Sequence, residues 1–374
     1  MNIHTPSYHR VVAIVALLTM SSVLACGGSS VVGGSPATEP PPTDTPAPTA
    51  TEKPLPPTAT PTPESRAISV ENAGDLKEAR TINTNDVGSW VSAVAFHPVE
   101  HRVATFGFDK MVRIWDADTG SMISQMGPHG NWGLGLAYSP DGSQLVSGGG
   151  GADIIVWDPS NGQKRGTAVS NARLVYDLAW SHDGERFAVV GEGSSRLALF
   201  SNSGSLDQEI PTGSGWLWSV AFSKDYLAAA NDTTLKIHVY DADGLGAVTE
   251  LSHPAVAGAL DFSPDGSLLA SCHRDGMINI WDTSDWSLVK SWMAHPKKGY
   301  ALGCKAGAFS LNGDVYVSGG DEGNVNVWDA HTGSLLNSFE FGVMVWSISM
   351  SGDGEMFAAG LDNGTLHVIS LPKD

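Results

Sequence analysis

The sequence predicts an all-β fold, a seven-bladed β-propeller, and two observations lead to it. Glycine (43 residues) and tryptophan (12 residues) are abundant in a chain of 374 residues that is only 16% charged, which is typical of short strands joined by tight turns. An apolar position that ends a strand also recurs at a mean spacing of about 42 residues, within the range of about 40–45 that a four-stranded blade needs. The seven anchors are Trp115, Trp157, Phe200, Tyr240, Trp281, Trp328 and Ile369.

Each unit repeats the pattern of strand, hairpin turn and strand. In the fifth unit, residues 258–262 form an apolar strand, residues 263–266 a Ser-Pro-Asp-Gly turn, and residues 268–271 a second strand. Asp or Asn before Gly accepts the positive φ that a hairpin tip requires. The equivalent turns are residues 139–142, 181–184, 310–313 and 351–354.

Tryptophan is followed by aspartate at four of the anchors, in residues 115–116, 157–158, 281–282 and 328–329. With this repetition the chain resembles the WD-repeat β-propeller family over residues 67–374, although units three, four and seven keep only the spacing. Quinoprotein-type propellers have a docking motif similar to residues 117–120 and 330–333, but their tryptophan follows the glycine. The resemblance therefore implies a propeller of the WD-repeat type.

The ring is expected to close through the N-terminal part of this domain. After Ile369 only a short, proline-containing segment remains, which cannot supply an outer strand for the seventh blade. Residues 76–82 lie just before the first inner strand, residues 91–96, and can take that place. Closure of this kind leaves no unpaired sheet edge.

The N-terminal segment, residues 1–25, resembles a bacterial lipoprotein signal peptide. A short polar start precedes an apolar run, residues 11–24, which is too short to span a bilayer core of about 30 Å. The resemblance implies cleavage before Cys26 and acylation of its sulfur. An uncleaved or ordinarily cleaved secretory signal is the alternative.

Residues 26–66 are expected to form a linker between lipidated Cys26 and the propeller, residues 67–374. Prolines and threonines dominate this segment between residues 36 and 63, and such a composition cannot build a packed core. It favours polyproline-like extension of about 3.1 Å per residue. We therefore expect a tether that holds the propeller away from a membrane.

The sequence contains no recognisable motif for catalysis, metal binding or cofactor binding. It lacks His-Glu-x-x-His, paired Cys-x-x-Cys, Gly-x-Ser-x-Gly and Gly-Lys-Ser/Thr. We therefore expect no enzyme activity, no cofactor and no metal; the alternative is an extracytoplasmic propeller enzyme of the lactonase-like or quinone-cofactor type. The formal charge of -19 argues against nucleic acid as a partner, because an acidic surface repels phosphates.

The family resemblance implies a hydrogen-bonded tetrad inside some blades, made of His, Ser or Thr, Asp and Trp. Blade five carries the full set, blade six has Glu at the Asp place, and the first two blades carry incomplete sets. The two fuller sets are His253, Ser271, Asp275 and Trp281, and His295, Ser318, Glu322 and Trp328. A Ser-His-Asp trio also occurs in hydrolases, but its recurrence at the repeat period favours a structural network.

Two cysteines lie at the same face of neighbouring blades. Cys272 follows the second strand of blade five, and Cys304 begins the inner strand of blade six. A disulfide is conceivable in an oxidising compartment, but its geometry is demanding and buried thiols are common in cores. The residues thus favour free thiols and leave pairing open.

One face, around the channel mouth, is expected to bind a partner. Large aromatic side chains occur at the entrance of the inner strands in blades seven, one, two, three and four, and basic residues occur in the loops of blades five and six. The aromatic residues are Trp90, Trp132, Tyr176, Trp216, Trp218 and Trp346, and the basic residues are Arg274, Lys297, Lys298 and Lys305. Trp, Tyr and Arg dominate binding hot spots, and a positive potential steers an acidic ligand. Alternatively, the rings fill gaps between blades and the lysines are solvated.

These observations together predict a monomeric, exported propeller that binds a protein or peptide partner of acidic character. Its contact with the membrane is expected through the lipid anchor only, on the extracytoplasmic side of a bacterial cell.

Overall fold

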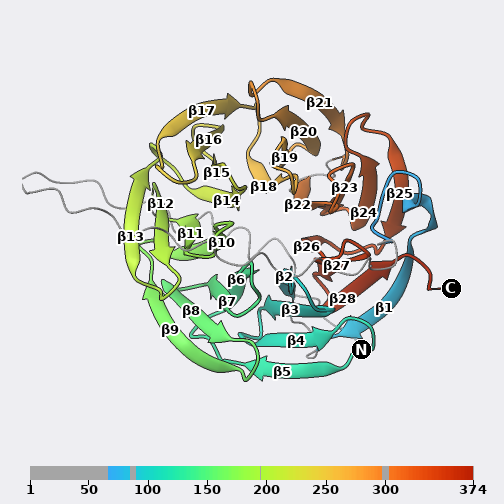
Figure 1. The fold of residues 1–374 in the computed structure, drawn as a ribbon, viewed down its shortest axis with the longest axis horizontal. Helices are drawn as coiled ribbons and strands as arrows, with labels where there is room; N and C mark the ends of the chain where they lie inside the picture. The colour runs from blue at the N-terminus through green and yellow to red at the C-terminus, as the bar shows by residue number, and fades with distance from the viewer. Residues whose placement is uncertain (1–65, 85–89, 194, 297–302, 374) are drawn as a thin grey trace, which may run out of the picture. The chain divides into compact units, whose positions relative to one another are not determined.

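Seven four-stranded antiparallel sheets form a ring in the computed structural model, which describes residues 66–84, 90–193, 195–296 and 303–373. Each sheet is a blade that runs from an inner strand at the central channel to an outer strand at the rim (Figure 1). The inner strands of neighbouring blades contact one another all the way round, from β2 (Val91–Phe96) of blade one to β26 (Val345–Met350) of blade seven. The predicted all-β, seven-bladed propeller is confirmed.

The strands of each blade follow one another in the sequence. Blade one consists of β2, β3 (Arg102–Gly107), β4 (Val112–Asp116) and β5 (Met122–Met126). Blade two consists of β6 (Gly133–Tyr138), β7 (Leu145–Gly149), β8 (Asp153–Asp158) and β9 (Gln163–Val169). Blade three consists of β10 (Leu174–Trp180), β11 (Arg186–Glu192), β12 (Arg196–Ser201) and β13 (Leu206–Pro211). Blade four consists of β14 (Leu217–Phe222), β15 (Tyr226–Asn231), β16 (Lys236–Asp241) and β17 (Ala247–Ser252). Blade five consists of β18 (Ala257–Phe262), β19 (Leu268–His273), β20 (Met277–Asp282) and β21 (Leu288–Met293). Blade six consists of β22 (Cys304–Phe309), β23 (Val315–Gly320), β24 (Asn324–Asp329) and β25 (Leu335–Glu340).

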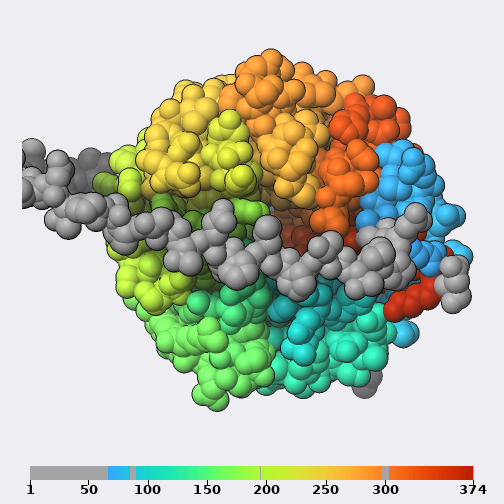
Figure 2. Space-filling view, in the orientation of Figure 1, coloured from blue at the N-terminus to red at the C-terminus, as the bar shows by residue number. Residues whose placement is uncertain are grey.

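Blade seven is built from both ends of the domain. It consists of β26, β27 (Met356–Leu361), β28 (Thr365–Ser370) and, as its outer strand, β1 (Lys77–Asn83), which follows the short 3-10 helix η1 (Ala73–Asp75). Strand β1 pairs antiparallel with β28. The predicted closure by an N-terminal strand is confirmed, with the strand one residue later than residues 76–82, and the blue N-terminal segment lies beside the red C-terminal blade (Figure 2).

Burial follows the position of a strand within its blade. The second strands are almost entirely buried, as in β19 and β27, whereas the outer strand β21 alternates between exposed and half-buried residues. The second strands are buried on both faces because each sheet is sandwiched between its neighbours. This explains why they appear in the sequence as continuous apolar runs rather than as alternating patterns.

Every inner strand contains a β-bulge at the same place. The pairing with the second strand shifts register between Val91 and Ala93 in blade one and at the equivalent step of the other six blades. A bulge leaves one residue unpaired and re-aims its side chain. The unpaired residues are Ser92, Leu134, Tyr176, Trp218, Gly258, Lys305 and Trp346.

Side chains along the channel connect inner strands of neighbouring blades. In blade seven the hydroxyl oxygens of Ser347 and Ser349 accept hydrogen bonds from the N–H groups of Val94 (3.0 Å) and Phe96 (2.9 Å) in blade one. Asp261 accepts a bond from the Phe309 N–H (2.7 Å) in the same way. These bonds satisfy backbone N–H groups on the free side of the inner strands. Such groups need a side-chain partner, because the inner strand is the last strand of its blade toward the channel.

Among the described residues, no helix is long and apolar enough to cross a membrane. The predicted signal peptide, Cys26 and the proline-rich linker lie outside the described residues.

Candidate functional site

The inner-strand bulges bring aromatic and basic side chains together around one mouth of the channel. We call this group the collar. Its members are Trp90, Phe108, Trp132, Tyr176, Trp216, Trp218, Arg274, Lys305 and Trp346, and all of them are half-buried. Tyr176, Trp218, Lys305 and Trp346 are themselves bulge residues. The bulge therefore explains why side chains at this one position of the repeat turn away from the sheet.

One aromatic stack of the collar joins blades seven, one and two. The Trp346 and Trp90 rings stack at 5.3 Å with an interplanar angle of 16°. Trp90 also contacts Phe108 at 4.6 Å, and Phe108 stacks on Trp132 at 5.4 Å. The indole N–H of Trp346 donates to Asp362 (2.8 Å), whose pKa is raised because the carboxyl group is partly buried.

A second aromatic stack joins blades three and four. Tyr176 stacks on Trp218 at 4.2 Å with an interplanar angle of 9°, and Trp216 lies tilted against both rings at 6.5 Å. Asp232 holds the Trp216 backbone and the Trp218 indole, because it accepts hydrogen bonds from the Trp216 backbone N–H (2.8 Å) and the Trp218 indole N–H (3.3 Å). The Tyr176 hydroxyl donates to Glu192 (3.3 Å).

Two cations lie on the rings at the ends of these stacks. The Arg274 guanidinium lies 3.8 Å from the Trp218 ring centroid, and the Lys305 ammonium lies 4.3 Å from the Trp346 ring centroid. Cation–π contacts of this kind are worth about 0.5–2 kcal/mol. Burial and, second, the nearby charge of Arg274 lower the pKa of Lys305 to about 7, while Asp321 and Asp177 act in the opposite direction.

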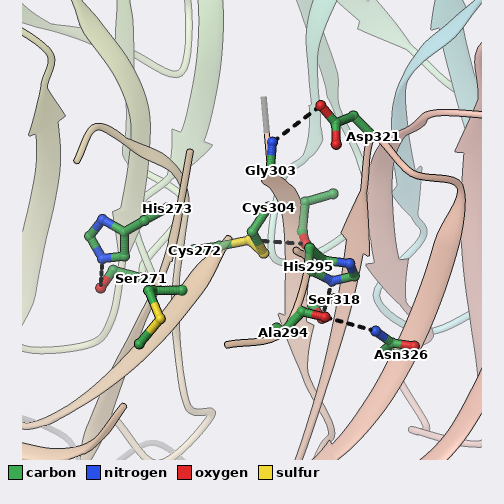
Figure 3. Close-up of a disulfide and its surroundings, with 12 residues drawn as sticks. Ser271, Cys272, His273, Ala294, His295, Gly303, Cys304, Ser318, Asp321 and Asn326 are labelled. Atoms are coloured by element: carbon green, nitrogen blue, oxygen red, sulfur yellow. Dashed lines mark hydrogen bonds between the residues drawn. A yellow bond between two sulfur atoms is a disulfide. The ribbon is translucent and has the colours of Figure 1, made fainter. Parts of the chain in front are cut away.

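Cys272 and Cys304 form a disulfide that joins blades five and six (Figure 3). The expectation of free thiols is wrong. Strand β19 packs directly against β22, and the two Cα atoms lie 5.3 Å apart, a distance that a disulfide requires. The sequence could not show this closeness, because the two residues are 32 positions apart in the chain.

The tetrad of blade five differs from the prediction. The Trp281 indole N–H donates to the Ser271 hydroxyl oxygen (2.9 Å), but the imidazole next to Ser271 is that of His273 (Nε2, 2.9 Å), which lies two residues later on the same strand (Figure 3). His253 instead stacks on His273 at 3.6 Å, and Asp275 accepts a hydrogen bond from the Met277 N–H (3.1 Å) in its own turn. The pKa of His273 is lowered to about 3, mainly because the imidazole is buried and to a smaller extent because of the charge of His253.

Blade six contains the complete network. His295 Nε2 lies 2.7 Å from Ser318 Oγ, the Trp328 indole N–H donates to the same oxygen (2.8 Å), and His295 Nδ1 contacts Glu322. Glu therefore fills the place at which the family resemblance implied Asp. Because the side chains of His295 and Glu322 are 0% and 5% exposed, this trio is closed to a substrate, and its role is to satisfy buried polar groups.

The first two blades contain incomplete versions of this network. In blade two, His129 Nε2 and the Trp157 indole nitrogen both lie 2.7 Å from Ser147 Oγ, and burial lowers the pKa of His129 to about 4. In blade one the Trp115 indole N–H donates to Thr105 (2.9 Å). The hydrogen bond from the indole N–H to a hydroxyl oxygen thus recurs in both blades, but among the described residues no carboxylate completes the network as Glu322 does in blade six.

Two carboxyl groups, those of Asp177 and Asp261, lie on the inner strands β10 and β18. Burial raises the pKa of Asp177 to about 6, although Ser219, Val220 and Leu178 donate hydrogen bonds to it at 2.8–3.0 Å. Burial also raises the pKa of Asp261 to about 7. No group of three or more His, Cys, Asp or Glu side chains that could hold a metal occurs within the described ranges.

The structure brings together every predicted aromatic residue of the binding face, as well as Arg274 and Lys305. The predicted Lys297 and Lys298 lie outside the described residues. Phe108 and Asp232 were not predicted, although their places are visible in hindsight because they follow the second strands of their blades. The rings pack between blades and remain half-buried rather than buried; binding at this face stays a prediction.

Four segments of the chain match the family model described as WD domain, G-beta repeat: residues 77–116, 121–158, 248–282 and 286–329. Each segment begins in or before the outer strand of one blade and ends in the third strand of the next. The matching units are those that carry the Trp-Asp pair. A comparison with curated proteins finds no significant match.

Proposed function

We propose that this seven-bladed β-propeller, whose chain contains WD40 repeats, is a rigid platform that binds a protein or peptide partner at the collar. WD40 domains generally mediate protein interactions, and the collar provides the residue types that dominate binding hot spots. The observation that carries the proposal is the two aromatic stacks of half-buried rings, which together extend over five blades from Trp346 to Trp218. We assign the protein no catalytic step.

We further propose that the platform is exported and tethered to the extracytoplasmic side of a membrane through Cys26. The Cys272–Cys304 disulfide supports export, because structural disulfides persist in oxidising compartments. Replacing Cys26 with Ser is expected to release the protein from the membrane fraction without changing its thermal unfolding. A Ser variant that stayed in the membrane fraction would contradict the anchor.

Affinity capture from native membranes tests the binding face. The double variant Trp90→Ala/Trp216→Ala removes one ring from each stack, and we expect it to lose the partners that the wild type captures. The matched control is Trp292→Ala, which removes a half-buried indole from the outer strand β21, away from the collar. If the folded double variant retained every partner of the control, the binding site would lie elsewhere on the propeller.

A further inference from the structure

Arg274 and Lys305 are the two charged members of the collar, and neither has an anionic partner among the described residues. In the described part of the chain, their charged groups make cation–π contacts and neither a hydrogen bond nor an ion pair. Both side chains are half-buried, so solvent water hydrates their charged groups only in part. Their charges are close enough that Arg274 lowers the pKa of Lys305.

The neighbouring carboxylates do not fill this gap, since each of them accepts a hydrogen bond from another donor and the structure shows no ion pair between them and the two cations. Asp232 accepts hydrogen bonds from Trp216 and Trp218, Asp177 from Ser219 and two backbone N–H groups, and Asp321 from the Gly303 N–H at 3.2 Å (Figure 3). They moderate the potential at the two cations without bonding to them. The two cations therefore keep donors to offer to an acceptor from outside.

The backbone holds the two cations in a fixed relation. The disulfide joins Cys272, two residues before Arg274, to Cys304, the residue before Lys305. Between them Gly303 approaches so closely that a Cβ atom there would lie 2.6 Å from the carbonyl oxygen of Arg274. Blade five contributes only Gly258 at the bulge position, which leaves the space beside Trp218 to the Arg274 side chain.

We propose that Arg274 and Lys305 form an anion subsite of the collar that binds a carboxylate group of the partner peptide. This inference deepens the proposed function and depends on it. A carboxylate has two oxygens that accept charge-assisted hydrogen bonds from guanidinium and ammonium groups. The Trp218 and Trp346 rings behind the cations reduce the access of water, which strengthens such bonds. The carboxylate comes from an Asp or Glu side chain or from the C-terminus of the peptide.

The affinity for the carboxylate depends on pH through Lys305. The groups that act on its titration are Arg274, which favours the neutral amine, and Asp321 and Asp177, which favour the ammonium ion. Because the pKa of Lys305 is lowered to about 7, the lysine loses its proton as the pH rises from 6 to 8.5. We expect the affinity to fall several-fold over this range in the wild type and to change less in Lys305→Arg.

Selection from displayed peptides tests the subsite and separates it from the proposed function. The full-length protein is exposed to two phage libraries of random heptapeptides, one with free C-termini and one with the random segment inside a loop. We expect selected peptides to combine aromatic and acidic residues. Acid enrichment in both libraries indicates a side-chain carboxylate, whereas selection from the free-C-terminus library alone, without acid enrichment, indicates the C-terminal carboxylate.

The double variant Arg274→Gln/Lys305→Met is expected to reduce the affinity for the selected peptides at least tenfold and to abolish the acid enrichment, while aromatic residues are still selected. Lys224→Met, an exposed lysine in the turn between β14 and β15, is the matched control and should change nothing. Thermal unfolding checks that each variant is folded. Loop peptides selected without acid enrichment would overturn the subsite alone, whereas no selection of any peptide from either library would overturn both the subsite and the collar as a peptide-binding face.

Discussion

The network inside blade six and the cationic pair of the collar show two ways of placing a polar group in this propeller. In the network, His295, Ser318 and Trp328 share their hydrogen bonds, and Glu322 contacts the second imidazole nitrogen. In the collar, Arg274 and Lys305 rest on indole rings and have no hydrogen-bonding partner in the described chain. Hydrogen bonds shared within a buried cluster indicate a structural role, whereas donors held in place without an acceptor among the described residues indicate a binding role.

The two regions also differ in what keeps their residues in place. Side-chain hydrogen bonds position the members of the network, so each depends on the others. In the collar, a disulfide and a bulged backbone position the cations instead. The cations can therefore be removed singly without disturbing their neighbours.

The disulfide is expected to have the largest effect on stability. Cys272→Ser/Cys304→Ser should lower the free energy of unfolding by about 3 kcal/mol, because the bond restricts the unfolded chain across a separation of 32 residues. Urea unfolding of the oxidised wild type and of the variant measures the difference. An equal loss of stability on adding reductant to the wild type, and none on adding it to the variant, would sharpen the assignment to this bond.

Removal of the shared hydroxyl from the blade-six network should cost somewhat less. Ser318→Ala leaves the Trp328 N–H and His295 Nε2 without the common partner in a site that is 0% exposed, and we expect a loss of about 2 kcal/mol. Ser334→Ala, at an exposed turn of the same blade, is the control in urea unfolding. Equal midpoints for the two variants would show that the network contributes no stability.

The acidic positions of blades five and six should respond differently. Glu322→Ala removes the buried partner of His295 and is expected to cost about 1–2 kcal/mol, whereas Asp275→Ala removes only a bond to the backbone of its own turn and should cost less than about 1 kcal/mol. Thermal unfolding of both variants checks this order. The reverse order would mean that Asp275 supports His273 or His253 in solution.

Replacement of the unpaired lysine should change stability least and in the opposite direction. The pKa of Lys305 is about 7 in the folded protein and about 10.4 in an unfolded chain, so the unfolded state binds more protons between these values. Wild-type stability therefore rises with pH from 7 to 10, and Lys305→Met should stabilise the protein by about 1 kcal/mol at pH 6.5, a gain that disappears near pH 10. Urea unfolding at three pH values measures this; destabilisation by Lys305→Met at pH 6.5 would show that the ammonium has a partner.

The blade-five tetrad shows how far repeat spacing can be trusted. The spacing placed Ser271 and Trp281 correctly, because the two residues are diagonal neighbours on the paired strands β19 and β20, close enough for the indole N–H to reach the hydroxyl oxygen. The family resemblance implied His253 as the partner of that hydroxyl, but in the structure His273 contacts it and His253 stacks on His273, which only packing decides. The disulfide is a similar case, because the closeness of Cys272 and Cys304 arises between blades rather than within one.

The sequence by itself determined the period, the number of blades, the closure by an N-terminal strand and the side of the ring at which the aromatic residues gather. These features follow from local rules, namely the alternation of strands and turns and the register of paired strands. Only the tertiary structure decided that Trp346, Trp90, Phe108 and Trp132 stack across blades, that Arg274 and Lys305 rest on rings without an acceptor, and that a disulfide joins their blades. The physical reason is that such contacts depend on how neighbouring blades pack at the bulged inner strands, which no single repeat specifies.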